Sequence, residues 1–227
     1  MLDIVKFFYN KGCELLHINT VFEAEWTVED SKLFYLELKD VADFLLKHPD
    51  FEVAFFDDQY FKPLPEDDIQ CWCGGSGKML AFDYDGTAYP CTRFAPTSLG
   101  DSCKPLPVGN VDEVFTTPEA QNTYKCLTCI TRRTKNTDDC FYCPIASGCA
   151  DCEAWNYQWA GGVLDKRCIN ICIMHKARSL ANVYYWNKYY KQTNKQKHFK
   201  MYLPKEEALK IIDEDEYNEL LRLSKED

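Results

Sequence analysis

Cysteine is the residue type whose number and spacing in this chain point to chemistry. The 227 residues contain 13 cysteines, and the stretch from residue 126 to residue 172 is the richest in them. Its cysteines are Cys126, Cys129, Cys140, Cys143, Cys149, Cys152, Cys168 and Cys172. Thiolates so close in sequence can converge on one metal centre, and iron–sulfur clusters and structural zinc both use such ligands. The stretch therefore predicts a metal centre.

More cysteines precede this stretch, and they flank a signal for a β-hairpin. Cys71 and Cys73 come just before a glycine-rich loop, and Cys91 follows a β-rich run that contains Asp85-Gly86. An Asp-Gly pair predicts a tight turn, because glycine supplies the positive φ that the turn needs. The hairpin would fold Cys91 back towards Cys71 and Cys73, so we expect these separated thiols in one place.

Several ligand sets compete for the metal. The four cysteines of residues 126–143 have the paired C-x2-C spacing of a zinc ribbon, although the gap between the pairs is short for one. The four cysteines of residues 140–152 are loosely similar to a ferredoxin run, but their spacing does not match the bacterial pattern. Cys168, Cys172 and His175 have the spacing of a CxxxCxxC motif with histidine in the third place. They follow the cysteine core, so we attribute this match to chance.

A further set fits better. It begins with Cys73, continues with Gly86-x4-Cys91 and the C-x2-C-x5-C-x2-C pattern of residues 140–152, and ends with one later cysteine. This order resembles the SPASM domain, the C-terminal auxiliary-cluster module of radical S-adenosylmethionine (radical SAM) enzymes that modify peptides. The family usually has three residues before the fourth core cysteine, where this chain has two. Residues 71–192 as a whole look closest to the maturases associated with CXXX-repeat target peptides.

The resemblance implies two [4Fe–4S] clusters. One would be held by Cys140, Cys143, Cys149 and a final cysteine. We prefer Cys172 to Cys168 for that last place, because Cys172 directly precedes a predicted helix.

The second implied cluster would be held by Cys73, Cys91 and Cys152. Its fourth ligand is either Cys71 or no protein residue, in which case the open iron could bind a substrate thiolate directly. Hydrogen bonding and burial set the potential of such clusters.

The catalytic motif of the same family is missing. Radical SAM enzymes hold their radical cluster on a CxxxCxxC loop early in the barrel, and this sequence contains no such motif. We therefore expect a truncated or split C-terminal part that is inactive alone. S-adenosylmethionine would be a cofactor only if a complete barrel were supplied.

The pattern of apolar residues predicts an α+β fold. A helix over residues 2–12, a buried strand over 14–19, a helix that Thr27 and Asp30 begin as a capping box, and a strand over 51–56 are expected in turn. The resemblance identifies residues 1–70 as the last αβ unit of a radical SAM partial (β/α) barrel, with a Pro-rich acidic linker over 62–68.

Two further parts follow the linker. Residues 71–192 form the expected SPASM iron–sulfur domain, which ends in a helix from Ile173 to about Lys191. Residues 193–227 form a helical tail, with Pro204 expected as the first residue of one helix and a second helix over 216–223.

Charge and hydropathy limit the possible partners. The net charge of −10 argues against a general nucleic-acid binder and against adhesion to anionic membranes. No apolar run approaches the roughly 18 residues that span a bilayer, and the N-terminus has no features of a secretory signal. We therefore expect a cytoplasmic protein, where clustered cysteines bind metal rather than form disulfides.

The resemblance implies a part in the maturation of a ribosomally made, cysteine-containing peptide, with thioether cross-linking as the favoured chemistry. Its partners would be the cysteine-rich precursor peptide and a separately encoded barrel or an electron donor. The alternatives are a stand-alone electron-transfer or partner module with iron–sulfur clusters, and a zinc-stabilised interaction domain. Bound iron with acid-labile sulfide separates the first two from the third.

One basic stretch stands out in this acidic chain. It contains Lys188, Lys191, Lys195, Lys197 and Lys200. The stretch could dock an acidic leader peptide, while the simpler interpretation is a solvated charged face.

The remaining cysteines have open roles. Cys126 and Cys129 lie outside the usual cysteine set of the family and could be variant cluster ligands, a zinc pair or a redox pair. Cys103 is expected as a free thiol, and Cys13 as a packing residue.

Overall fold

The computed structural model describes residues 1–225, which form two compact units. The second unit consists of Leu64–Cys143 and Ala150–Ile169, and the first contains the rest of the described chain. The chain leaves the first unit after Pro63, inside the predicted linker. Residues 170–192, which the sequence assigned to the SPASM domain, belong instead to the first unit, because the helix that they form packs against a helix of residues 28–45.

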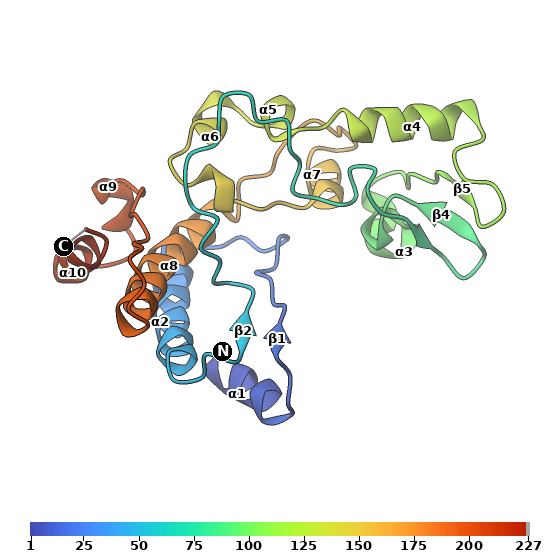
Figure 1. Cartoon of the computed structure of the whole chain (residues 1–227). Coiled ribbons are helices and arrows are strands. Elements are labelled where there is room, and N and C mark those ends of the chain that lie inside the picture. Colours follow the sequence, from blue (N-terminus) through green and yellow to red (C-terminus); the bar gives the residue numbers. More distant parts are fainter. Residues whose placement is uncertain (226–227) are drawn as a thin grey trace. The chain divides into compact units, whose positions relative to one another are not determined.

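The first unit is mostly helical and contains one small sheet (Figure 1). Its elements are α1 (Leu2–Asn10), β1 (Leu15–Leu16), α2 (Val28–Leu45), β2 (Glu52–Val53), the 3-10 turn η3 (Ala146–Gly148), α8 (Cys172–Gln192), α9 (Lys205–Ala208) and α10 (Glu214–Leu223). The predicted capping box is confirmed, since the Thr27 side chain accepts from the Asp30 N–H and the Asp30 carboxylate accepts from the Thr27 N–H.

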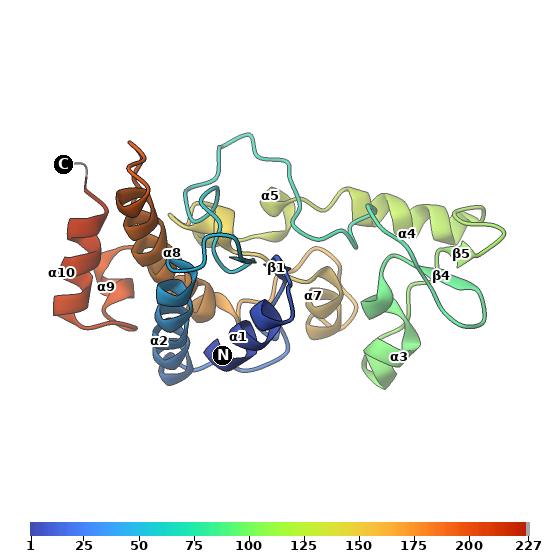
Figure 2. The same cartoon turned by 60° about the horizontal axis from the view of Figure 1, so that its bottom comes forward.

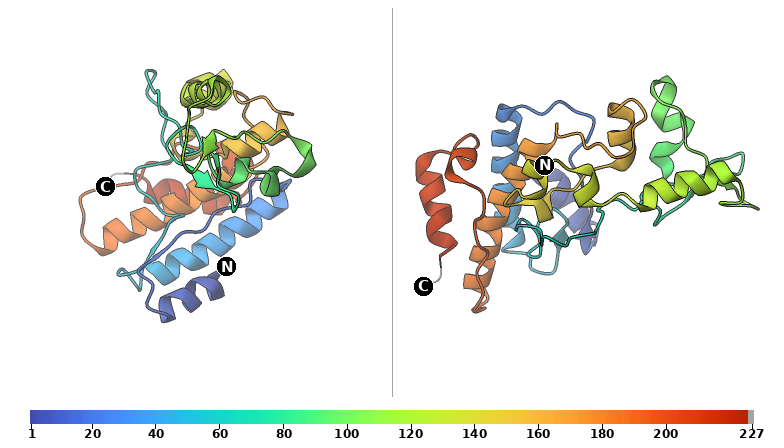
Figure 3. Two further views of the ribbon diagram at one scale, coloured as in Figure 1. Left: turned by 90° about the vertical axis from the view of Figure 1, so that its right-hand side faces the viewer. Right: turned by 90° about the horizontal axis from the view of Figure 1, so that it is seen from above.

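Helices α2 and α8 form the core of the first unit and lie side by side (Figures 1 and 3). The apolar stripe of α2 is buried at Tyr35, Leu38 and Leu45, and α8 is buried at Leu180 and Ala181. Burial of such side chains supplies most of the stability of amphipathic helices. The buried faces of α2 and α8 therefore form the core of the first unit.

The two strands of the first unit are shorter than predicted. Strands β1 and β2 pair in parallel over two residues each, and Leu15 in the expected buried strand is 47% exposed. Side chains of α8 account for the early end of β2. Arg178 donates from Nε to the Phe55 carbonyl at 2.7 Å, and Asn182 donates to the same carbonyl at 2.9 Å. The Phe55 carbonyl therefore bonds to side chains of α8 and not to another strand, and this sheet has two strands.

Helices α9 and α10 lie beside α8 (Figure 2). The carboxylate of Glu216 accepts from the Tyr35 hydroxyl and pairs with Lys39 at 2.7 Å, which ties α10 to α2. Leu220 of α10 is fully buried. The second tail helix is thus confirmed, whereas Pro204 immediately precedes α9 instead of being its first residue.

The second unit has short elements joined by long loops. They are β3 (Ala81–Phe82), β4 (Thr87–Tyr89), η1 (Thr92–Phe94), α3 (Pro96–Leu99), η2 (Gly100–Ser102), β5 (Gly109–Asn110), α4 (Pro118–Thr128), α5 (Arg132–Lys135), α6 (Asp138–Phe141) and α7 (Glu153–Trp159). Strands β3 and β4 are antiparallel and β5 pairs with β4. Gly86 has a φ of 85°, which confirms the predicted Asp-Gly turn.

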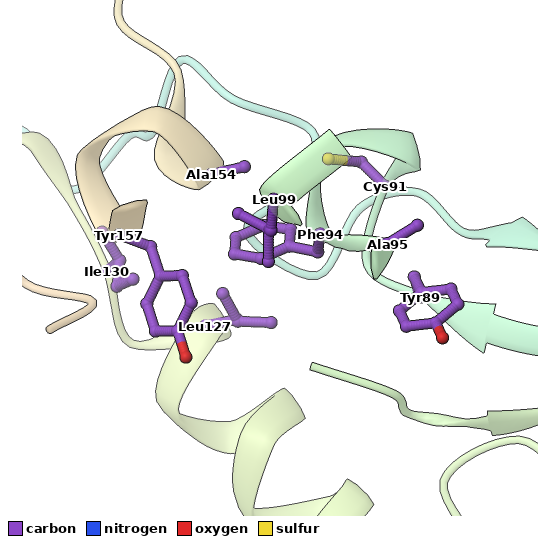
Figure 4. Close-up of a cluster of buried hydrophobic side chains, with 9 residues drawn as sticks. All are labelled: Tyr89, Cys91, Phe94, Ala95, Leu99, Leu127, Ile130, Ala154 and Tyr157. Carbon is purple, nitrogen blue, oxygen red and sulfur yellow. The ribbon is translucent and has the colours of Figure 1, made fainter. Parts of the chain in front are cut away.

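A compact hydrophobic cluster holds the second unit together. It comprises Tyr89, Cys91, Phe94, Ala95, Leu99, Leu127, Ile130, Ala154 and Tyr157 (Figure 4). The cluster draws on the hairpin, the segment after it, α4 and α7. Cys71, Cys103 and Cys152 pack against its edge. Four of the cysteines of the chain therefore gather around one small core.

The α2–α8 core yields a direct test of the first unit. Leu38 is fully buried, whereas Leu36 on the same helix is 57% exposed. We expect Leu38→Ala to lower the free energy of unfolding by about 2–5 kcal/mol, because it leaves a cavity in a packed core. The matched control Leu36→Ala should change it by less than about 0.5 kcal/mol. Urea titration followed by circular dichroism measures both, and equal effects would contradict this packing.

Candidate metal centre

Two cysteines distant in sequence face one glycine in the second unit. A Cβ atom placed on Gly75 would lie 3.3 Å from Cys73 Sγ, 3.5 Å from Cys91 Sγ and 3.4 Å from the Phe94 ring. Gly75 itself is buried. The hairpin thus brings Cys91 back to Cys73, and a residue without a side chain keeps the space between the two sulfurs clear.

Cys152 lies close to the same pair. It immediately precedes α7, and its thiol is near enough to Cys91 and to Cys73 to interact with both electrostatically. Burial raises the pKa of Cys73 to about 11, although the backbone N–H groups of Glu153 and Gly75 act in the opposite direction. Burial likewise raises the pKa of Cys152, against the N–H groups of the first turn of α7. The sulfurs are at least partly buried, and backbone donors point at those of Cys73 and Cys152.

Cys71 has a more polar environment than these three. Its sulfur lies 3.1 Å from Ser76 Oγ and 3.5 Å from Glu153 Oε1, and the Lys135 ammonium donates to it at 3.7 Å. Cys71 is therefore held at the edge of the site by polar side chains.

Lys135 is the centre of a buried group of charges. Its Nζ lies 2.8 Å from Asp151 Oδ2 and contacts Glu153 Oε1, and all three side chains are at most 2% exposed. Burial opposes the lysine charge, but the two carboxylates raise the pKa of Lys135 above its ordinary value. The ammonium in turn lowers the pKa of Asp151, whereas burial raises that of Glu153. Lys135 is therefore paired with both carboxylates inside the unit.

A buried asparagine extends this polar group to a further cysteine. Asn156 of α7 donates to Asp151 Oδ2 at 2.7 Å, and the backbone N–H of Cys168 donates to Asn156 Oδ1 at 2.9 Å. Cys168 itself is buried. The network connects α5, both residues that flank Cys152 and the segment that carries Cys168.

Arg132 fixes the loop that carries Cys71 and Cys73. Its guanidinium makes a two-point contact with Asp68, with Nε 2.8 Å from Oδ2, and lies over the Trp72 ring at 5.4 Å. Both charged side chains are largely buried. Arg133, the next residue in the sequence, instead lies at the surface beside Asp138. Arg132 therefore positions the loop.

The remaining predicted ligands are placed as follows. Cys140 lies in α6 and Cys143 just after it, both in the second unit, whereas Cys149 and Cys172 belong to the first unit. The assignment of those four to one cluster stays a prediction. Cys126 and Cys129 are exposed near the end of α4.

Cys103 has partners of its own. Its thiol is directed at the backbone carbonyls of Tyr157, at 3.8 Å, and of Gln158, at 3.6 Å. It thus packs against the same small core as the candidate ligands while its sulfur bonds to main-chain oxygens. These contacts make it a natural reference cysteine for the site.

The donor set fits a cluster that contains several irons and sulfides. Within residues 1–225 no three His, Cys, Asp or Glu side chains are grouped as ligands of a single metal ion. The thiols of Cys73 and Cys91 instead border a clear space at Gly75 that a Cβ would fill, and Cys152 lies near both.

Sequence reasoning missed the residues that support the site. Lys135, Asp151 and Glu153 are surface residue types by frequency, and the sequence separation between the lysine and the carboxylates hides their contact. The one usable signal was the position of Asp151 and Glu153 on either side of Cys152. Gly75 gave no separate signal, because it is one of several glycines in its loop.

Comparisons with known proteins add no assignment. No family model, no curated protein and no solved structure matches the chain. Among the helices of residues 1–225, none is both long enough and apolar enough to cross a membrane.

The buried charges generate a prediction about stability. We expect Lys135→Met to lower the free energy of unfolding by about 3–5 kcal/mol, because it leaves Asp151 and Glu153 buried without their cation. Lys78→Met, at an exposed position of the same unit, is the matched control and should change stability by less than about 0.5 kcal/mol. Denaturant titration measures both variants. A loss below 1 kcal/mol for Lys135→Met would mean that the charges are not buried together.

Proposed function

We propose that the second unit holds a [4Fe–4S] cluster on Cys73, Cys91 and Cys152, with Cys71 as the fourth ligand. We further propose that the chain is an auxiliary-cluster module in the maturation of a cysteine-containing peptide by a radical SAM enzyme. The observation that supports this proposal most directly is that Cys73 and Cys91, from two separate segments, meet at the buried Gly75, while Cys152 from a third segment is an electrostatic neighbour of both.

The environment of these thiols supports a cluster. Thiolate ligands in iron–sulfur proteins accept hydrogen bonds from backbone N–H groups, and those bonds and burial tune the potential. Backbone N–H groups of Gly75 and Glu153 face Cys73, and those of Ala154 and Trp155 face Cys152. The Arg93 charge also acts on Cys152. Such donors offset the negative charge that several thiolates and sulfides bring together.

Cys71 is the preferred fourth ligand because it packs against the same core and its sulfur contacts a buried cation. Lys135 donates to it while the ammonium is held by Asp151 and Glu153. A bound cluster would supply one-electron transfer or a binding point for a substrate thiolate. Lys135 would keep Cys71 in place.

The part in peptide maturation rests on the resemblance to SPASM domains. Because the sequence has no CxxxCxxC motif, the radical step is assigned to a barrel that carries this motif, and this chain is given the auxiliary role. The alternative function is a zinc-stabilised interaction domain, since the same thiols could bind zinc.

Metal and sulfide content of each variant is the decisive measurement. After anaerobic purification and reconstitution we expect about eight irons and eight sulfides per chain if both implied clusters form. Cys91→Ala should remove about four irons, because it takes away a ligand at the centre of the site. Cys103→Ala is the matched control, since Cys103 packs against the same core but bonds to carbonyls. Zinc without labile sulfide, or equal iron in both variants, would refute the proposal.

The clear space at Gly75 gives a separate test. Gly75→Ala would place a methyl group between Cys73 and Cys91, so we expect it to reduce the iron retained per chain by about half. Gly74→Ala is the matched control, because its Cβ would meet only the flexible side chain of Met79. Iron content and the visible absorption of the reconstituted proteins report the result. Unchanged iron in Gly75→Ala would mean that the space between the two sulfurs is not used.

A further inference from the structure

A basic groove of about 570 Å³ lies in the first unit, between the ends of two helices. Its lining comes from the end of α8, the segment that follows it and the end of α10, and comprises Asn187, Lys191, Lys195, Gln196, Lys197, His198, Arg222, Leu223 and Lys225. No aspartate or glutamate of the described chain lines it. The local excess of cations contrasts with the net charge of −10 for the whole chain.

The groove is built on a fixed support. Asn187 of α8 donates to the Phe199 carbonyl at 2.9 Å and accepts from the Phe199 N–H at 2.8 Å, and both side chains are buried. These two bonds hold the segment of residues 195–198 against the helix. The cations of that segment are therefore presented from an ordered backbone.

Some of these cations already have partners. Lys197 pairs with Asp58, and Arg222 pairs with Glu219 at 2.7 Å. Lys191 and Arg222 also lie in the last turns of their helices, where a positive charge offsets the helix dipole. Lys195 and Lys225 lie beyond the helices and form no ion pair among residues 1–225. Lys195 lies over the Tyr189 ring, with Nζ 5.0 Å from the ring centroid, and both lysines line the groove.

An aromatic groove of about 500 Å³ adjoins the basic one and shares Lys195 and Lys197 with it. Its lining includes the rings of Phe51, Phe56, Tyr185, Trp186, Tyr189 and Tyr190, together with the carboxylates of Glu52, Asp57 and Asp58, of which Asp58 is paired with Lys197. The rings support one another, with Trp186 5.6 Å from Tyr189 and 5.7 Å from Tyr190. The Trp186 N–H is held by Asn182 at 3.1 Å. The aromatic surface is therefore preformed beside the cations.

We infer that this pair of grooves binds an acidic peptide segment, with its carboxylates on the lysines and an adjacent apolar or aromatic side chain on the rings. A long polyanion is disfavoured, because the rest of the strongly acidic chain would repel it. Lysines also predominate over arginine here, whereas bidentate phosphate recognition favours arginine. The inference deepens the proposed function, on which it rests, since it names how the first unit would recognise a peptide substrate.

Fluorescence anisotropy with the full chain tests the inference. The probe is a short labelled peptide that alternates glutamate with phenylalanine, and the comparison probes replace glutamate with lysine or phenylalanine with alanine. We expect the glutamate–phenylalanine peptide to bind at least about tenfold more tightly than the lysine version. Its affinity should fall as salt rises, because screening weakens contacts between exposed charges.

Charge reversal in the groove separates specific from general attraction. The double variant Lys191→Glu/Lys195→Glu should weaken binding of the acidic peptide at least about tenfold. Its matched control, Lys6→Glu/Lys11→Glu, makes the same change in net charge at exposed positions in α1 and directly after it, and should bind like the wild type. The neutral variant Lys191→Gln/Lys195→Gln should bind the acidic peptide more tightly than Lys191→Glu/Lys195→Glu and more weakly than the control variant. Circular dichroism checks that each variant is folded.

Three results would overturn the inference. They are equal binding of the glutamate and lysine peptides, equal weakening by the groove and control variants, and tighter binding of a labelled single-stranded oligonucleotide than of the acidic peptide. Iron content, measured on the same samples, distinguishes failure of the cluster proposal from failure of the groove proposal. Bound iron without peptide binding refutes only the groove, and peptide binding without iron refutes the cluster.

Discussion

The buried ammonium group of Lys135 is the interaction on which the second unit depends. It joins α5 to the two carboxylates that flank Cys152 and to the sulfur of Cys71. The helices of this part of the chain are mostly one or two turns long, and its strands are two or three residues long. Regular hydrogen bonding alone holds such a unit weakly. A charge that cannot leave its partners without a large desolvation cost therefore fixes where the cysteine-bearing loops lie.

Metal binding would complement this arrangement. The hydrophobic cluster of the second unit is small, and several of the candidate ligands pack on its edge. Units with small cores commonly take part of their stability from metal ligation, because the free energy of binding adds to that of folding. The proposed cluster would thus join segments that few apolar contacts join, and folding and cluster insertion would be linked.

Local signals in the sequence were sufficient for local structure. The capping box at Thr27, the turn at Gly86 and the helix of residues 172–192 follow from rules that involve neighbouring residues, and the structure contains them. The same turn explains the approach of Cys91 to Cys73. The lengths of the strands could not be predicted from such rules. Arg178 of α8, more than 100 residues further along the chain, donates to the carbonyls of Ala54 and Phe55 directly after β2. The support of the site by Lys135 was hidden for the same reason.

The two units are interleaved along the chain, and this has a consequence for the order in which they form. The polypeptide enters the second unit at Leu64, returns to the first at Pro144, leaves it again at Ala150 and returns at Asn170. A ribosome therefore completes α2 long before it makes α8. At roughly 5–20 residues per second the delay lasts several seconds or more, during which the buried face of α2 lacks α8. Every residue of the second unit precedes α8 in the chain, so the second unit can form before the core of the first unit is closed.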